Sequence, residues 1–267
     1  VQNITDPDIV PYIPDGIGNS TDRQRIPAVL IIPGGAFRRL VYNFEGEDVA
    51  KWLNSMGIAA FVLECRLPSD EHDNAEDVPL IDAMRAMRVI RGRAQEFGID
   101  EAKIGVMGFS AGGFMAALLS TAYESDVYAD YKYKDEYDKL SARPDFAVCS
   151  YPVISIDDCI EAGKRYMSEE QVLERISDGK AKILHKYNPD KLVRPDMPPV
   201  FICETDDDRT TLSENSVGFY MAARKAGVSA ELHIFRTGGH GYGCGDDFAQ
   251  TGEWKVLFTK WIKSIGI

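Results

Sequence analysis

Residues 104–113 read Ile-Gly-Val-Met-Gly-Phe-Ser-Ala-Gly-Gly, an apolar run that leads directly into a glycine-rich turn. Ile104–Met107 is typical of a short buried strand, and Phe114–Tyr123 has the composition of a helix. The turn between them carries Gly-x-Ser-x-Gly centred on Ser110, a pattern that becomes informative between a strand and a helix. Its small residues permit a turn so sharp that the Ser110 hydroxyl projects from the end of the sheet, near a helix N-terminus. A glycine-rich turn with a capping serine is the plain alternative.

Apolar runs alternate with helical patterns along the rest of the chain, as in stacked β-α-β units. The expected strands are Ala28–Ile32, Ile58–Leu63, Ile104–Met107, Phe146–Ser150, Val200–Glu204 and Glu231–Phe235. The expected helices are Glu47–Met56, Leu80–Phe97, Phe114–Tyr123, Glu214–Ala226 and Trp254–Ile265. We therefore predict one α/β domain over residues 1–267, with a mostly parallel central sheet and helices on both faces.

Two stretches are longer than an ordinary connection requires. Glu124–Arg143 is rich in Tyr and Asp, and Ser155–Pro195 contains a predicted helix near Glu169–Asp178. Long insertions at strand ends often lie over ligand sites. We therefore expect lid-like segments at 124–143 and 155–195, with surface decoration as the alternative.

A serine nucleophile needs a general base, and the chain has four histidines. His240 follows the last expected strand within Gly-Gly-His-Gly, where flanking glycines leave the imidazole free to reach the end of another strand. We expect His72 to be a solvated surface residue, and His185 and His233 to be structural. A glycine-rich loop that happens to contain a histidine is the alternative for His240.

The base in turn needs a carboxylate to orient it. Asp206, Asp207 and Asp208 follow directly after the strand Val200–Glu204, although an acidic turn or helix cap would have the same composition. The resulting order of nucleophile, acid and base along the chain is that of the α/β-hydrolases.

An oxyanion hole needs backbone amides that point at the reacting carbonyl oxygen. Gly34 and Gly35 close the strand Ala28–Ile32, and glycines allow backbone N–H groups to turn toward a ligand. The amide of Ala111, directly after Ser110, would supply a further donor. A tight Gly-Gly turn without a function is the alternative.

Composition restricts the classes of partner. The chain is 45% hydrophobic and 27% charged, with a formal net charge of −12 and no basic run longer than Arg38-Arg39. This excludes a basic surface for nucleic acid, and the apolar runs are far shorter than the roughly 18 residues that span a bilayer. Five scattered cysteines without a Cys-x-x-Cys pair predict neither a disulfide framework nor a structural zinc site. We expect no metal and no cofactor, and the sequence leaves a homo-oligomer open.

The N-terminus shows no basic segment followed by an apolar one, as a secretory leader would. Together with the unpaired cysteines, this favours a cytoplasmic location. Secretion stays open because the chain begins with Val1 rather than Met.

The chain resembles the α/β-hydrolases of the esterase/lipase superfamily, and more narrowly the carbohydrate acetyl esterases, including bifunctional acetylxylan/feruloyl esterases. The resemblance covers nearly the whole chain and rests on Pro33–Phe37, Glu45-Gly46, Arg66-Leu67, Asp82–Ala86, Gly108–Gly113, Tyr151–Val153, Glu214–Ser216 and Gly238–Gly241. It implies Ser110 as nucleophile, His240 as general base, and the loop Gly34–Ala36 with Ala111 as the oxyanion hole.

Two positions depart from the pattern usual in this superfamily. Ala36 stands where a third glycine is common, and Thr211-Leu212 stands where Val-Pro usually follows the catalytic acid. The acid is therefore open between two neighbours. Register against the missing Val-Pro favours Asp208, whereas related peptidases with paired acids favour Asp207; our prediction is Asp208.

The resemblance implies a serine carboxylic-ester hydrolase that removes acetyl groups from carbohydrate esters, such as acetylated xylo-oligosaccharides, through an acyl-enzyme. Alternatives are a general small-ester carboxylesterase, an arylformamidase, or a binding protein without activity on the same fold. Phe37, Tyr42 and Tyr242, with the tyrosines of 124–143, are candidate flat faces for sugar rings, and simple packing is the alternative for each.

Overall fold

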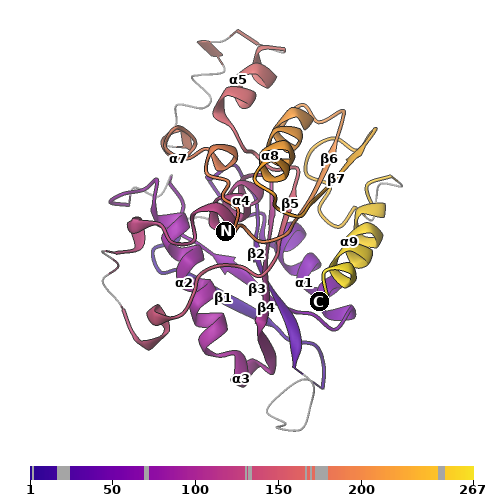
Figure 1. Cartoon of the computed structure of the whole chain (residues 1–267). Helices are drawn as coiled ribbons and strands as arrows, with labels where there is room; N and C mark the ends of the chain where they lie inside the picture. The colour runs from indigo at the N-terminus through magenta and orange to yellow at the C-terminus, as the bar shows by residue number, and fades with distance from the viewer. Residues whose placement is uncertain are drawn as a thin grey trace.

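The central sheet of this protein has seven strands in the order β1-β3-β2-β4-β5-β6-β7 (Figure 1). The computed structural model describes residues 1, 3–16, 25–68, 72–129, 131, 134–165, 167–168, 170–171, 180–245 and 250–267. The strands are β1 (Asp8–Tyr12), β2 (Ile26–Ile32), β3 (Ala59–Glu64), β4 (Ile99–Phe109), β5 (Ala147–Ser150), β6 (Val200–Thr205) and β7 (Ala230–Phe235). Only β1 pairs antiparallel, with β3, and the other described pairs are parallel. The predicted mostly parallel sheet is confirmed.

Helices cover both faces of this sheet. They are α1 (Asp48–Ser55), α2 (Val78–Gly92), α3 (Ala94–Phe97), α4 (Ala111–Ala122), α5 (Ile156–Lys164), α7 (Lys180–Lys186), α8 (Ser213–Lys225) and α9 (Glu253–Ser264). Shorter turns of helix are η1 (Asn43–Glu47), η2 (Asp126–Tyr128), η3 (Glu136–Lys139) and η4 (Pro189–Lys191). In Figure 1, α1 and α9 lie on the opposite side of the sheet from α2.

Alternation along β2 divides the core into two layers. Leu30 packs in the layer under α2, α4 and α8, whereas Val29 and Ile31 pack in the layer under α1 and α9. Successive side chains of a strand point to opposite faces, so a strand buried on both faces needs the continuous apolar run that the sequence shows. Each large apolar side chain buried in this way contributes roughly 1.5–3 kcal/mol.

Three differences from the predicted elements are the largest. Strand β1 is not among the expected strands. It contains Pro11, which cannot donate to a ladder, and it lies at the edge of the sheet, where a proline is tolerated. Strand β4 begins at Ile99, five residues before its apolar run. The predicted helix Leu80–Phe97 is divided at Arg93 into α2 and α3, and Gly98 ends α3 in the left-handed region with φ of 68°.

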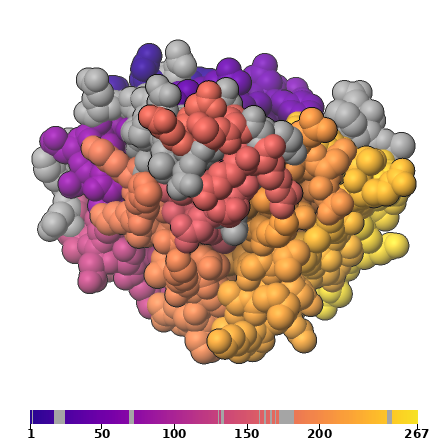
Figure 2. Space-filling model, turned by 90° about the horizontal axis from the view of Figure 1, so that it is seen from above, coloured from indigo at the N-terminus to yellow at the C-terminus, as the bar shows by residue number. Residues whose placement is uncertain are grey.

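The two predicted insertions contain short helices where they are described. Segment 124–143 holds η2 and η3, and segment 155–195 holds α5, α7 and η4, whereas the helix predicted near Glu169–Asp178 lies largely outside the described residues. Helix α5 stands at the top of Figure 1, and Figure 2 shows its residues near the centre of the face seen from above. Asn215 of α8 accepts hydrogen bonds from the amides of Ile154 and Ser155, which ties the start of this segment to α8.

The turn at Ser110 is held by two close backbone approaches. Ser110 itself has φ of 53° and ψ of −117°, a strained conformation for a residue with a side chain. A Cβ atom on Gly112 would lie 1.9 Å from the carbonyl oxygen of Ile32, and one on Gly108 would lie 1.9 Å from that of Gly112. The glycines of Gly-x-Ser-x-Gly are therefore required for packing as well as for the turn.

Gly112→Ala should lower the free energy of unfolding by about 3 kcal/mol, the upper end of what overpacking costs, because the colliding atoms belong to backbone. Gly218→Ala is the control: it lies within α8, nothing approaches its Cβ position within 4 Å, and alanine should add about 0.5–1 kcal/mol. Urea denaturation of both variants measures the difference. Equal stabilities would contradict this account of the turn.

Among the described residues, no helix is long and apolar enough to cross a membrane. The same part of the chain holds no group of three or more His, Cys, Asp or Glu side chains arranged for a metal ion.

Candidate active site

Three side chains from the ends of three strands form a hydrogen-bonded chain. Ser110 follows β4, Asp208 follows β6 and His240 follows β7. The Ser110 Oγ atom lies 2.8 Å from His240 Nε2, and His240 Nδ1 lies 2.7 Å from Asp208 Oδ2. With the proton on Nδ1, the imidazole donates to Asp208 and accepts the serine hydroxyl proton, the arrangement that activates a serine.

The neighbouring acids Asp207 and Asp208 have different partners. Asp208 is 3% exposed, and its Oδ1 accepts from the amides of Thr210 (2.7 Å) and Thr211 (3.0 Å). Burial opposes its ionisation, but the hydrogen bond and charge of His240 and these two amides outweigh burial and keep the pKa of Asp208 below its ordinary value. Asp207 instead accepts from the amides of Gly238 and Gly239, at 2.9 and 2.8 Å, and so anchors the loop that carries His240.

Thr211 is not among the predicted site residues, yet its hydroxyl lies beside both Asp208 and His240. Its hydroxyl donates to Asp208 Oδ2 at 3.0 Å and lies 3.2 Å from His240 Nδ1. In the sequence, Thr211 stands out only because Thr211-Leu212 replaces the usual Val-Pro. A hydroxyl there adds a hydrogen bond to the carboxylate that Val would lack.

The other three histidines lie elsewhere. His72 Nε2 contacts the carbonyl oxygen of Ile4 at 3.0 Å, and His233 Nε2 contacts Glu231 Oε1 at 2.7 Å. His185 is an exposed residue of α7. Among the histidines, all four of which are described, His240 is the one hydrogen-bonded to Ser110.

The loop after β2 lies against Ser110. A Cβ atom on Gly34 would come within 3.0 Å of the Ser110 Cβ atom. The Gly34 amide, however, already donates to Glu45 Oε2 at 2.7 Å. Of the three predicted oxyanion donors, the amides of Gly35 and of Ala111, which begins α4, remain once Gly34 is bonded to Glu45.

Ala36 adopts the conformation that a glycine would take without strain. Its φ is 57°, and the next residue, Phe37, has φ of 58°. Each costs of the order of 1–2 kcal/mol for a residue with a side chain. Such strain persists only where surrounding contacts enforce it, and it is common around functional loops.

The predicted sugar-stacking faces divide between buried and half-buried rings. Phe37 is buried with its ring edge-on to Phe114, at a centroid distance of 5.6 Å. Tyr242 is fully buried and packs on Tyr151 at 4.5 Å. Both residues therefore have the packing role that was their alternative. In segment 124–143, Tyr128 is buried as well, whereas Tyr131 and Tyr137 are half-buried, as is Tyr42.

A second buried acid lies beside Asp208. Glu204 is 0% exposed; its Oε1 accepts from the amide of Thr205 at 2.9 Å, and its Oε2 contacts the Ser216 hydroxyl at 3.3 Å. Burial, together with the charge of Asp208 and a hydrogen bond to it, raises the pKa of Glu204 well above its ordinary value of 4.5. The sequence showed only an acid at the end of a strand, and burial is what distinguishes it.

This acid makes stability depend on pH. Above about pH 4.5 the unfolded chain releases the Glu204 proton that the folded chain retains, so the free energy of unfolding falls as pH rises, by up to about 1.4 kcal/mol per pH unit, until the raised folded pKa is reached. Glu204→Gln removes this dependence and keeps a hydrogen-bond donor for Asp208. The variant should therefore gain stability over the parent between pH 5 and pH 8, as measured by denaturant unfolding.

Glu214→Gln on α8 is the control for this titration, because Glu214 is exposed and pairs with Arg165 on the surface. Its stability relative to the parent should be the same at pH 5 and pH 8. A constant difference for Glu204→Gln as well would mean that Glu204 titrates normally.

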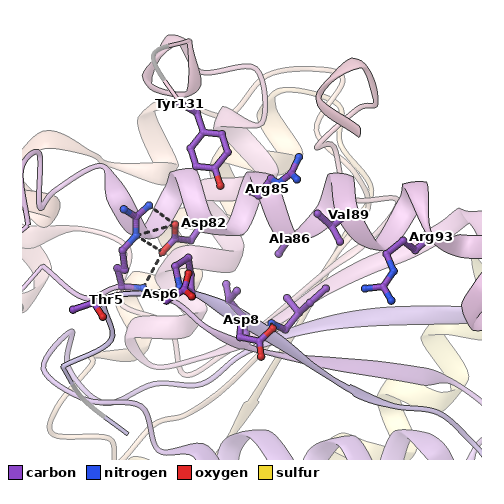
Figure 3. A pocket seen from close by; sticks show the side chains of 13 residues that line it. Thr5, Asp6, Asp8, Asp82, Arg85, Ala86, Val89, Arg93 and Tyr131 are labelled. Carbon is purple, nitrogen blue, oxygen red and sulfur yellow. Dashed lines mark hydrogen bonds and ion pairs between the residues drawn. The ribbon is translucent and has the colours of Figure 1, made fainter. Parts of the chain in front are cut away.

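A separate pocket of about 440 Å³ lies between the N-terminal segment and α2 (Figure 3). Arg66 forms one wall, and its guanidinium and amide both bond to the buried carboxylate of Asp82. This pair joins the end of β3 to α2 and explains two of the motifs noted in the sequence. None of Ser110, Asp208 and His240 lines the pocket.

A family model described as BD-FAE matches residues 17–222, most of the chain. An acetylxylan esterase from Xylanibacter ruminicola is 31% identical over 240 residues, which are 89% of this chain and 45% of that protein. Endo-1,4-beta-xylanase B from Butyrivibrio fibrisolvens is 31% identical over 227 residues, which are 85% of this chain and 34% of that protein. The chain thus spans less than half the length of either relative.

Solved structures agree with this assignment. An acetyl ester-xyloside bifunctional hydrolase from Caldicellulosiruptor lactoaceticus is 38% identical, with a TM-score of 0.77 over 97% of this chain and 88% of that one. A thermophilic esterase from Thermogutta terrifontis is 25% identical, with a TM-score of 0.74 over 98% of this chain and 90% of that one. The predicted α/β-hydrolase fold is confirmed, and this chain belongs to the BD-FAE family.

Proposed function

We propose that this protein is a serine carboxylic-ester hydrolase that removes acetyl groups from carbohydrate esters such as acetylated xylo-oligosaccharides. The observation that carries the proposal is the chain of hydrogen bonds from Ser110 through His240 to Asp208. The substrate class is supported by two similar proteins, an acetylxylan esterase and an acetyl ester-xyloside hydrolase.

Acylation is the first half of the proposed reaction. The Ser110 oxygen attacks the ester carbonyl carbon while its proton passes to His240 Nε2, and the carbonyl π electrons move onto oxygen. His240 then gives the proton to the departing sugar oxygen, which leaves acetyl-Ser110 and a free hydroxyl on the carbohydrate. Asp208 stabilises the imidazolium and holds its tautomer without taking the proton.

Deacylation repeats these steps with water as the nucleophile. His240 accepts a proton from water as the oxygen attacks the acetyl carbon, and Ser110 leaves as its proton returns. The amides of Gly35 and Ala111 are the proposed donors to both oxyanions, each with an expected contribution of about 2.7–4 kcal/mol. Gly34 is left out of this pair because its amide is bonded to Glu45.

A small-ester carboxylesterase is the second candidate. The similar Thermogutta terrifontis esterase has solved structures with propionate and with butyrate bound. Both candidates use the same residues. They differ in the alcohol portion of the ester and, since propionate and butyrate are longer than acetate, in the length of the acyl group.

Acetate release distinguishes the two. The protein is given acetylated xylo-oligosaccharides and, separately, 4-nitrophenyl acetate, with Ser110→Ala as the control for each. Release from both substrates, lost in the variant, is the expected result. Release from the nitrophenyl ester alone would favour the small-ester carboxylesterase, and release from neither would overturn the proposed function.

A further inference from the structure

Glu45 is a buried acid that the proposed reaction does not use. It lies in η1, a single π-helical turn directly before α1, and it is 3% exposed. Short π-helical turns inside helices are uncommon and frequently occur at functional sites. Glu45-Gly46 is part of the family resemblance, which implies no role for either residue.

The carboxylate of Glu45 receives one hydrogen bond on each oxygen. Oε2 accepts from the Gly34 amide at 2.7 Å, and Oε1 accepts from the Tyr151 hydroxyl at 2.8 Å. Burial raises the pKa of Glu45, whereas these two donors favour the ionised form and oppose the effect of burial. The acid thus anchors the first residue of the predicted oxyanion loop.

Tyr151 continues the connection to the loop of His240. Its hydroxyl oxygen accepts from the Gly243 amide at 3.0 Å, three residues beyond His240. The edge of its ring contacts the imidazole at a centroid distance of 5.1 Å. Gly243 is held by its carbonyl as well, which accepts a hydrogen bond from Trp254 Nε1 at 3.0 Å.

These contacts join two loops that must keep a fixed relative position during the reaction. In the predicted oxyanion loop Gly34–Ala36, Ala36 has a positive φ, and so does Phe37 directly after it. For residues with a side chain these conformations need support from surrounding contacts. Electrostatic stabilisation of an oxyanion depends on donors that are in place before the charge develops. A displacement of about 1 Å in such a group costs about 10²-fold in rate.

We propose that Glu45 is a positioning residue, which through Tyr151 and Gly243 holds the oxyanion loop in register with His240. This inference rests on the proposed esterase function. Glutamine cannot replace the acid fully, because its amide has one acceptor oxygen for two donors and its NH₂ group would face one of them.

The test measures kcat and KM for 4-nitrophenyl acetate in the parent, Glu45→Gln, Tyr151→Phe and the double variant. Glu47→Gln is the matched control, since Glu47 lies two residues away in the same turn and pairs with Lys51 on the surface. Each variant is also titrated with a trifluoromethyl ketone. The Ser110 oxygen adds to the carbonyl carbon of this inhibitor, and the adduct is a tetrahedral oxyanion. Circular dichroism and thermal unfolding establish that the variants are folded.

The expected result is a fall in kcat of about 10²-fold for Glu45→Gln, with KM nearly unchanged. The inhibition constant of the ketone should rise in proportion to the loss of kcat/KM, because both depend on the oxyanion donors. Tyr151→Phe should lose less, since the Gly34 contact remains, and the double variant should lose less than the product of the two single losses. Glu47→Gln should match the parent.

The inference would be overturned if Glu45→Gln and Tyr151→Phe both had the same kcat and the same inhibition constant as Glu47→Gln. If Glu45→Gln does not fold, Tyr151→Phe decides alone. A parent protein that hydrolyses no ester would overturn the proposed function and this inference with it, an outcome distinct from an active parent with unaffected variants.

Discussion

Ser110→Ala should lower kcat for 4-nitrophenyl acetate by about 10⁶-fold, the size of loss seen when a serine protease loses its nucleophile. The Ser110 oxygen is the predicted attacking atom, 2.8 Å from the imidazole nitrogen that takes its proton. Without it no acyl-enzyme forms, and only weak catalysis by the remaining groups is left. The loss is measured from initial rates at a high enzyme concentration, after subtraction of the rate of spontaneous hydrolysis.

Ser55→Ala is the control for this substitution, because Ser55 is an exposed residue at the end of α1 whose hydroxyl bonds only to the carbonyl of Trp52 among its described partners. It should retain full activity and label with a fluorophosphonate, whereas Ser110→Ala should not label. Substantial ester turnover by a folded Ser110→Ala protein would mean that another group is the nucleophile.

Asp208→Asn should reduce kcat by about 10⁴-fold, because an amide at this position favours the wrong imidazole tautomer and cannot stabilise the imidazolium. The carboxylate is 2.7 Å from His240 Nδ1 and receives three further hydrogen bonds, so the substitution changes charge with little change in shape. Steady-state kinetics of the folded variant give the loss directly.

Asp207→Asn is the matched control, one residue away. Its amide oxygen still accepts from Gly238 and Gly239, so activity should stay within a few-fold of the parent. The reverse pattern, a large loss for Asp207→Asn and a small one for Asp208→Asn, would assign the acid to Asp207.

Much of the fold could be predicted because the apolar pattern is local. Strands buried on both faces, such as β2 and β6, appear as continuous apolar runs, and the helices end at glycines with positive φ such as Gly57 and Gly98. Strand β1 could not be predicted, because its residues are only partly buried and include Pro11. Its pairing with β3 depends on a neighbour some fifty residues away in the chain.

The candidate site divides in the same way. Ser110 and His240 lie in short glycine-rich turns whose composition already indicates their conformation. The choice between Asp207 and Asp208 could not be made from composition, because both follow the same strand. It depends on which carboxylate points inward, and the amides of Thr210 and Thr211 direct that one toward His240.

By itself, the sequence determined the α/β class, the sharp turn at Ser110 and the loop of His240, since each depends on residues adjacent in the chain. Only the tertiary structure decided the partners of Gly34, Glu45, Tyr151 and Glu204. Glu45 and Tyr151 are 106 positions apart, and Gly243 is 92 beyond Tyr151. A hydrogen bond requires its atoms within about 3 Å of one another. Burial beside Asp208 is what makes Glu204 differ from a surface acid, so these roles exist only once the chain has folded.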